Sequence, residues 1–169
     1  MTAADAARRI RAVSEGDLPA IASIYAHYVE HTYVTFELDP PSLDAWTDRH
    51  RAARSSGHPW LVAEGEDGVV GYATCSTFNP KPAYRSTVET TIYLAQSAVG
   101  QGIGRPLYEA LLAEAAGPFH VALAAIALPN PGSVVLHERL GFSAVGVLDE
   151  VGHKLGDWRD VGWWQRRLV

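Results

Sequence analysis

The sequence is poor in sulfur, since its 169 residues include one cysteine and one methionine. With Cys75 alone, the chain has no second thiol for an internal disulfide, which excludes the class of small domains stapled by disulfides. Long hydrophobic runs are missing too, and none approaches the roughly 20 residues that a membrane-spanning helix needs. The opening MTAADAARRI lacks the apolar core of a signal peptide. We therefore expect a soluble, cytoplasmic protein without a membrane partner.

Positive charge is also scarce, because 14 Lys and Arg stand against 19 Asp and Glu, for a formal charge of -5. No basic tract stands out, which argues against a nucleic-acid partner. Repeats and long Pro, Gly or Ser linkers are absent, so nothing divides the chain into parts. A hydrophobic content of 47% is enough for a sizeable core. We expect one domain over residues 1–169, with residues 1–8 as a flexible N-terminus.

Hydrophobic patterning predicts strands and helices in the order β α α β β β α β α β β. A first strand is expected at 9–13, a hairpin at 59–78, single strands at 86–94 and 119–128, and two final strands around Gly156. Helices are expected at 14–31, at 41–57, from 104 onward and at 131–140. Because consecutive central strands require an antiparallel meander, the predicted fold class is α/β with a mixed, mostly antiparallel sheet flanked by helices.

The stretch VGQGIG places Gly100, Gly102 and Gly104 at alternate positions just before the third predicted helix. Glycines let backbone N–H groups converge on a ligand, and the positive end of the helix dipole favours an anion such as phosphate. The Walker pattern, and with it ATP or GTP, is disfavoured because Arg105 and Pro106 follow Gly104 where Lys and Ser or Thr are required. The dinucleotide fingerprint is disfavoured because Leu107 takes the place of its third glycine. On this segment alone, an ordinary strand-to-helix turn is also possible.

This loop, together with NPGSVVLHERLGF after the next strand, resembles the GNAT superfamily of N-acetyltransferases. The stretches YRSTVETTIYL, AAIALPNPGSVVLHERLGF and GHKLGDWRDVGWWQ resemble the phosphinothricin and methionine sulfoximine acetyltransferases more specifically. The resemblance extends from about Ile10 to the C-terminus. It implies direct transfer of acetyl from acetyl-CoA to the α-amine of a small amino-acid analogue, within a ternary complex and in a homodimer.

The resemblance also implies the residues that bind acetyl-CoA. The loop would bind the pyrophosphate through its backbone, the strand before it would pair with the pantetheine amides, and Asn130 would bond to the pantetheine arm. Helix capping is the alternative role for Asn130. The family pattern begins with Arg or Gln where this chain has Val99, so we expect weaker anchoring of the phosphates. The expected set is Ile92, Tyr93, Leu94, Val99, Gly100, Gln101, Gly102, Ile103, Gly104 and Asn130.

Two residues are candidates for the catalytic chemistry. Glu89 interrupts an apolar strand, where a carboxylate is costly unless it serves a site or has a partner, although a solvent-facing edge position is the alternative. By resemblance it is the general base, acting directly or through water. His137 stands at the family's histidine position, where it would protonate the thiolate or hold the sulfur by a hydrogen bond. A structural histidine is the alternative, and Tyr108 is interpreted as a packing residue.

The acceptor should carry a carboxylate beside its amine, so a guanidinium near Glu89 is expected. Arg85 lies four residues before Glu89, with a solvated loop charge as the alternative interpretation. Tyr33 and Phe36 are candidate walls of the acceptor pocket, or else core residues. With Glu89, these form the expected acceptor-binding set.

His27 and His31 are four residues apart, but no third ligand accompanies them, so no metal is expected. Trp158, Trp163 and Trp164 are expected to pack the last hairpin and a dimer interface. Two other functions fit the same fold. One is acetylation of a different amine, such as a protein N-terminus or a polyamine. The other is a regulatory domain that binds acyl-CoA without turnover.

Overall fold

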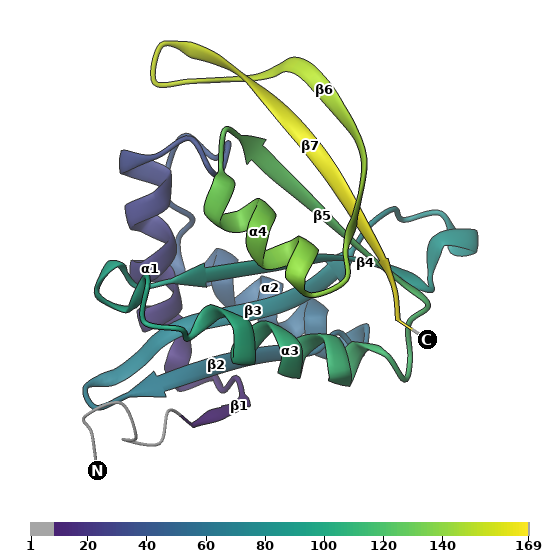
Figure 1. Cartoon of the computed structure of the whole chain (residues 1–169). Helices are drawn as coiled ribbons and strands as arrows, with labels where there is room; N and C mark the ends of the chain where they lie inside the picture. The colour runs from purple at the N-terminus through teal and green to yellow at the C-terminus, as the bar shows by residue number, and fades with distance from the viewer. Residues whose placement is uncertain (1–8, 169) are drawn as a thin grey trace.

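Strands and helices follow one another in the predicted order in the computed structural model, which describes residues 9–168 (Figure 1). The N-terminal segment that we expect to be flexible, residues 1–8, lies outside the described residues. The helices are α1 (Leu18–His31), α2 (Leu43–Ser55), α3 (Gly104–Ala115) and α4 (Pro131–Arg139). The strands are β1 (Ile10–Ala12), β2 (Trp60–Gly65), β3 (Gly68–Thr77), β4 (Thr87–Leu94), β5 (Val121–Leu128), β6 (Ser143–Lys154) and β7 (Asp157–Arg167).

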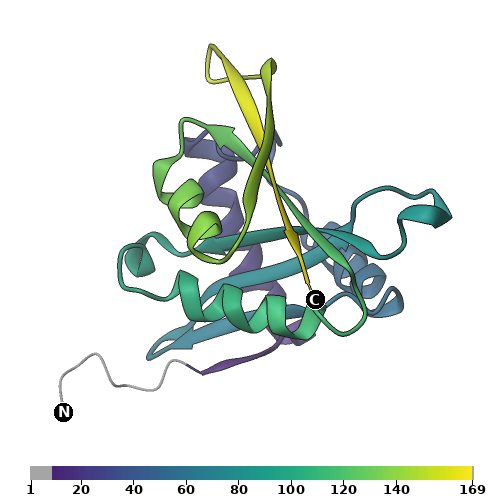
Figure 2. The ribbon, with the colours of Figure 1, turned by 45° about the vertical axis from the view of Figure 1, so that its right-hand side comes forward.

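One sheet of seven strands runs through the molecule in the spatial order β1-β2-β3-β4-β5-β7-β6. Every neighbouring pair is antiparallel except β4 and β5, which are parallel because α3 crosses over between them (Figure 2). The predicted mixed, mostly antiparallel α/β fold is therefore confirmed. None of the helices within residues 9–168 is both long and apolar enough to cross a membrane.

The first helix begins later than predicted, because the chain forms a short 3-10 turn over Glu15–Asp17 before α1. The Asp17 carboxylate accepts the backbone N–H of Ser14 at 2.8 Å and pairs with Arg11 at 2.7 Å. The Arg11 guanidinium holds the pKa of Asp17 well below its usual range. Ser14 is a cap, as the sequence suggested, but it caps this 3-10 turn instead of α1 itself.

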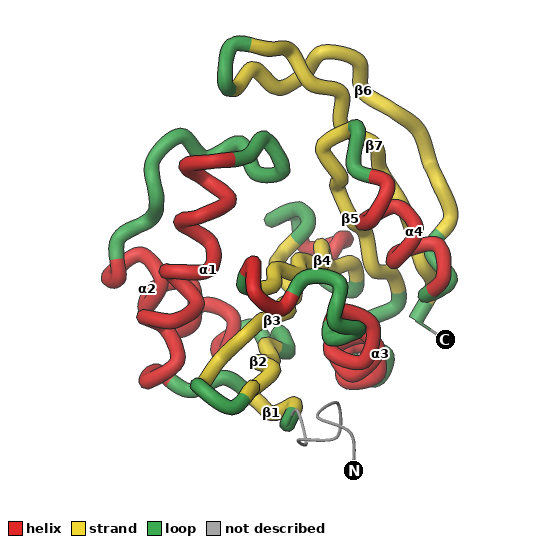
Figure 3. The backbone as a smooth tube through the Cα atoms, turned by 60° about the vertical axis from the view of Figure 1, so that its left-hand side comes forward, coloured by secondary structure: helices red, strands yellow, loops and turns green. Residues whose placement is uncertain are grey.

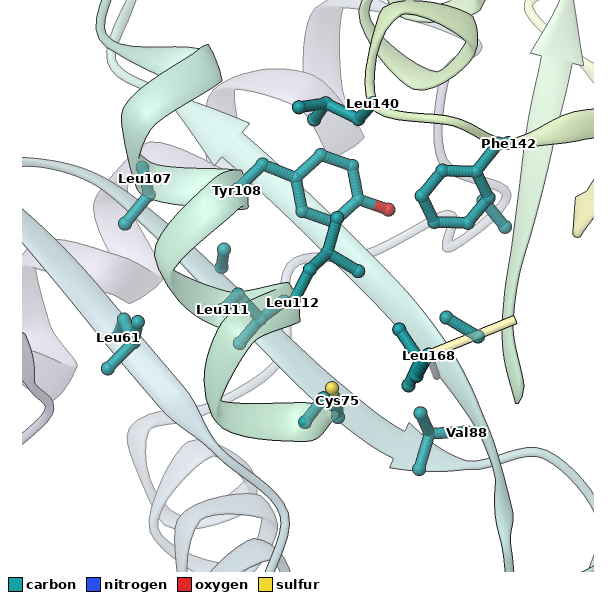
Figure 4. Packing of buried hydrophobic residues seen from close by; sticks show 14 of the residues in the cluster. Leu61, Cys75, Val88, Leu107, Tyr108, Leu111, Leu112, Leu140, Phe142 and Leu168 are labelled. Atoms are coloured by element: carbon teal, nitrogen blue, oxygen red, sulfur yellow. The ribbon is translucent and has the colours of Figure 1, made fainter. Parts of the chain in front are cut away.

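The helices cover the two faces of the sheet in pairs, with α1 and α2 on one side and α3 and α4 on the other (Figure 3). Alternation along each strand divides the core accordingly. On the α3 side, Leu107 and Leu111 of α3 belong to the same buried cluster as Val88 of β4 (Figure 4). On the α1 side, Ile21 and Trp46 pack on Tyr72 of β3. The sheet is thus covered on both faces.

The parallel ladder between β4 and β5 is short, since it pairs Thr87 with Val121 and ends where Glu89 lies opposite Leu123. At that point the Thr90 hydroxyl donates to the Leu123 carbonyl at 3.0 Å, so a side chain closes the ladder. Beyond Thr90 the two strands separate, while β3 and β7 stay paired with their outer edges. The backbone groups that face each other across this opening are available to a ligand.

Candidate active site

A single cavity of about 1170 Å³ passes through the opening between β4 and β5. One end reaches the glycine loop and the start of α3, and the other reaches α1 and α2 on the opposite face of the sheet. Glu89 and His137 both line it. So do nine of the ten residues expected to bind acetyl-CoA, namely Ile92, Tyr93, Leu94, Val99, Gly100, Gly102, Ile103, Gly104 and Asn130. The tenth, Gln101, lies outside the lining and donates to the Ser97 carbonyl.

The glycine loop has the backbone shape that the sequence suggested. Gly100 and Gly102 have φ values of 76° and 75°, in the left-handed region where side chains other than glycine are strained. A Cβ at either position would meet no protein atom within 4 Å. Helix α3 begins at Gly104, and the N–H groups of its first turn have no acceptor within the helix. The loop and helix start therefore fit a phosphate group.

The Asn130 side chain caps α4, because its Oδ1 accepts the backbone N–H of Ser133 at 3.2 Å. The capping role weighed for Asn130 is thus present, and the residue also lines the cavity. Ser133 in turn is one helical turn before His137, so the cap fixes the stretch of α4 that carries the histidine.

Glu89 is half-buried on β4, a strand that is paired on both sides, so it is not an edge-strand charge exposed to solvent. It shares the α1 side of the sheet with Tyr93, whose ring lies 5.0 Å from that of Tyr25. Within residues 9–168 its carboxylate forms no ion pair and no side-chain hydrogen bond. Burial raises the pKa of Glu89 above its ordinary value. An unpaired carboxylate with a raised pKa, facing a cavity, is suited to accept a proton.

His137 is 4% exposed and packs against the rings of Tyr108 and Phe142, at centroid distances of 5.0 and 5.2 Å. Its Nδ1 lies 2.7 Å from the Ser133 carbonyl oxygen. A carbonyl can only accept, so Nδ1 carries the proton and the neutral ring has Nε2 as a free acceptor. Burial lowers the pKa of His137. The geometry favours a neutral imidazole that accepts a hydrogen bond.

Tyr108 is fully buried in the core on the α3 side, which confirms its interpretation as a packing residue. Its hydroxyl contacts the Thr90 hydroxyl, which already donates to the Leu123 carbonyl. Tyr108 must therefore be the donor of this pair. Burial raises the pKa of Tyr108, which keeps it protonated. Its function in the structure is to support the residue that ends the β4–β5 ladder.

The α1 side of the cavity has features that sequence reasoning missed. Its wall is a cluster of aromatic rings: Tyr25, Tyr28, Trp46, Trp60, Tyr72 and Tyr93. Arg49 of α2 lines the same region. Aromatic residues at helical spacing are also what a buried helix face looks like, so the pattern carried no separate signal. Only the meeting of α1, α2 and β4 turns that face into a wall of the cavity.

Three of the residues expected to bind the acceptor lie outside the cavity lining in a single chain. Arg85 is exposed just after a turn at Pro82–Tyr84, on a connection that projects from the sheet (Figure 1). Tyr33 donates its hydroxyl to the Pro129 carbonyl at 2.6 Å. The Phe36 ring lies against Gly152, where a Cβ would meet it. The role of these three side chains in acceptor binding therefore stays a prediction.

The rings of His27 and His31 lie 5.0 Å apart on α1. No group of three or more His, Cys, Asp or Glu side chains that could hold a metal ion occurs among residues 9–168. Cys75 is buried, and burial raises the pKa of its thiol to about 12, so it is poorly suited to carry an acyl group.

Several known proteins are similar to this chain in both sequence and fold. A phosphinothricin N-acetyltransferase of Streptomyces coelicolor is 41% identical, over 95% of this chain and 96% of that protein. An L-methionine sulfoximine/L-methionine sulfone acetyltransferase of Pseudomonas paraeruginosa is 38% identical, over 94% of each. The structure of a phosphinothricin acetyltransferase from Sinorhizobium meliloti in complex with acetyl-CoA superposes with a TM-score of 0.92, at 36% identity, covering 95% of this chain and 88% of that one.

A family model described as an acetyltransferase (GNAT) domain matches residues 10–163. That range contains the glycine loop, the opening between β4 and β5, and both Glu89 and His137. The chain therefore belongs to the GNAT family of acetyltransferases.

Proposed function

We propose that this acetyltransferase moves acetyl from acetyl-CoA to the α-amine of a small amino-acid analogue of the phosphinothricin or methionine sulfoximine/sulfone type. The observation that carries the proposal is the unpaired, half-buried Glu89 in the same cavity as the glycine loop and His137. The names of the relatives support the acceptor class. We expect direct transfer within a ternary complex, because the only thiol of the chain, that of Cys75, is buried and is therefore poorly suited to carry the acetyl group.

Acetyl-CoA supplies an activated acetyl group, and the chain supplies its position. Residues Val99 to Gly104 and the first turn of α3 bind the phosphates through backbone N–H groups. Arg105, in that first turn, adds a positive side chain at the same end of the cavity. The free edge of β4 at Ile92, Tyr93 and Leu94 pairs with the pantetheine amides. This arrangement points the thioester toward Glu89 on the opposite face of the sheet.

Glu89 takes the proton that the acceptor amine loses. An amino acid arrives at neutral pH with its amine protonated, so the nucleophilic form has to be generated at the site. A carboxylate whose pKa is raised by burial holds that proton better than a solvated one. Glu89 acts directly or through one water molecule.

His137 positions the sulfur. With its proton committed to the Ser133 carbonyl through Nδ1, the neutral ring offers Nε2 as an acceptor. Because burial lowers the pKa of His137, a protonated ring that donates to the thiolate is disfavoured. The leaving sulfur takes the second proton of the attacking amine, and Nε2 then accepts the hydrogen bond of the resulting thiol. Of the two roles considered for this residue, a hydrogen bond to the sulfur therefore fits the contacts better.

The test is an acceptor screen with purified protein, acetyl-CoA and a reagent that detects free thiol. Phosphinothricin, methionine sulfoximine and methionine sulfone should release thiol and yield N-acetylated products by mass spectrometry. Release with N-terminal peptides or polyamines alone would favour acetylation of a different amine. Binding of acetyl-CoA without turnover of any acceptor would favour a regulatory domain.

We further propose that the chain works as a homodimer. Large apolar side chains are exposed along the last hairpin, at Val145, Val147, Leu148, Val151, Leu155 and Trp158. Strand β6 is the last strand of the sheet, so its outer edge has no partner strand among residues 9–168. An exposed apolar edge strand is a surface on which a second chain can pair.

A further inference from the structure

Few charged side chains line the cavity, and they lie in different parts of it. Glu89 is its only acidic lining residue among the described residues, and the guanidinium groups belong to Arg49 and Arg105. Arg105 stands at the start of α3, at the phosphate end, and pairs with Glu109 at 2.8 Å. Arg49 belongs to α2, on the opposite face of the sheet (Figure 3). The cation on the acceptor side of Glu89 is therefore Arg49.

The Arg49 guanidinium is held in a defined orientation. It lies over the ring of Trp46, with Cζ 4.9 Å from the ring centroid. Its Nη2 lies 2.6 Å from Oε1 of Glu37, which belongs to the connection between α1 and α2. Stacking on a buried indole fixes the plane of the guanidinium, and the fork of donors then faces a fixed direction.

The partner of Arg49 is exchangeable. The side chains of Arg49 and Glu37 are 43% and 35% exposed, so water screens the pair and it contributes little to stability. Glu37 does not line the cavity, whereas Arg49 does. A guanidinium has five N–H donors, and one contact with Glu37 leaves donors for a second oxyanion from the cavity side.

From this placement we infer that Arg49 binds an anionic group on the side chain of the acceptor, separate from the carboxylate beside its amine. The inference rests on the proposed function and narrows its acceptor class to amino acids with a second negative charge, such as a phosphinate or a carboxylate. Among the proposed acceptors, phosphinothricin carries such a group, while the sulfone of methionine sulfone is neutral. The chain should therefore prefer phosphinothricin.

Other cations are less suited to this role. His58 lines the same region, but burial lowers its pKa, so the ring is neutral at physiological pH. Arg85 is exposed outside the cavity lining and faces the Pro82 carbonyl at 3.5 Å. Arg85 stays our candidate for binding the carboxylate beside the amine. Arg85 would then bind the carboxylate beside the amine, and Arg49 would bind the anionic group on the acceptor side chain.

The test compares kcat/KM for phosphinothricin and for methionine sulfone in the wild type and in Arg49→Gln. Loss of one charge-assisted contact should lower kcat/KM for phosphinothricin roughly 10- to 100-fold, and that for methionine sulfone by less than about threefold. Arg49→Lys should restore part of the difference. Arg51→Ala is the matched control, because Arg51 is on the same helix, outside the cavity, and pairs only with Asp48 at 2.7 Å.

Glu37→Gln separates binding from a purely structural pair. If Arg49 binds the acceptor, removing its carboxylate partner should leave kcat/KM for phosphinothricin unchanged or higher. If the pair only braces the α1–α2 connection, Glu37→Gln and Arg49→Gln should lower both acceptors equally, which would overturn the inference. Wild-type turnover of neither acceptor would instead reject the proposed function.

Discussion

Glu89 is the residue whose replacement tests the chemistry most directly. Glu89→Gln keeps the size of the side chain and removes the charge, so turnover at saturating substrates should fall roughly 10²-fold. Because burial raises the pKa of Glu89, the wild-type rate should decline with acid at a pH above that of an ordinary glutamate, about 4.3. Turnover measured against pH for both proteins checks this. The variant should lose that acidic limb and recover part of its rate at high pH.

The same substitution carries its own folding control. A carboxyl group whose pKa is higher in the folded than in the unfolded state destabilises the fold as pH rises through the interval between the two values. At neutral pH the ionised Glu89 therefore costs stability, and Glu89→Gln should raise Tm while acetyl-CoA affinity stays constant. Unchanged turnover with the wild-type pH profile would show that the base lies elsewhere.

At the scale of single residues, the local sequence pattern was enough to identify some candidate site residues and not others. Glu89 could be singled out because a carboxylate within an apolar strand is conspicuous by itself. The tautomer of His137 depends on the Ser133 carbonyl one turn away, and only the built helix shows that bond. Arg49 was missed because its place in the cavity depends on its stacking over Trp46 and on β4, which is distant in sequence.

The glycine loop is the element on which cofactor binding depends. Gly102→Val adds a branched side chain where φ is 75° and where the phosphates should approach, so KM for acetyl-CoA should rise at least tenfold. Gly57→Val is the matched control, because Gly57 has a φ of 66°, an equally open Cβ position and no place in the cavity. Both variants should lose some stability, and only the first should lose cofactor affinity. Equal affinity in the two would remove the loop from the site.

The last hairpin contacts the connection that follows α1. Lys154 on β6 is buried, and its Nζ donates to the Thr35 carbonyl at 2.8 Å. The Thr35 hydroxyl contacts that of Tyr25, and both residues line the cavity. Lys154→Met keeps the aliphatic bulk and leaves that carbonyl without its donor, which should cost about 1–3 kcal/mol of stability and raise KM for the acceptor several-fold.

Matched measurements decide what Lys154 does. Lys81→Met, at an exposed position, should change neither Tm nor KM. KM for acetyl-CoA in Lys154→Met should stay near the wild-type value, because the bond braces only the acceptor side. Parallel increases for both substrates would mean that the lysine supports the fold in general.

The order of the elements could be predicted from hydrophobic period, and the helices begin and end within a few residues of expectation. The sequence pattern predicted a mixed sheet, but not that β4 and β5 are the parallel pair, nor the residue at which their ladder ends. That end depends on the Thr90 hydroxyl meeting the Leu123 carbonyl, a contact between residues 33 apart in sequence. The opening that forms the cavity is therefore a product of tertiary structure.

At the scale of the whole molecule, six large apolar side chains are exposed on the last hairpin, at one end of the sheet. Trp158 is 61% exposed on β7, where it pairs with His153, and Val147 and Leu148 are exposed farther along β6, opposite Gly162 and Val161. The aromatic ring of Trp158 packs only partly, against His153 at 4.7 Å. A second copy of the chain would cover this surface and pair with the free edge of β6.

Light scattering after size exclusion should accordingly give a mass of twice 18.3 kDa for the wild type. Val147→Lys and Trp158→Lys place charges on the apolar edge strand and its neighbour, so each should shift the mass toward that of one chain. Leu43→Lys is the control, because Leu43 is equally exposed but lies at the start of α2, away from the hairpin. A wild-type mass of one chain at all concentrations would reject the dimer. A dimer that survives both hairpin substitutions would place its interface on another face.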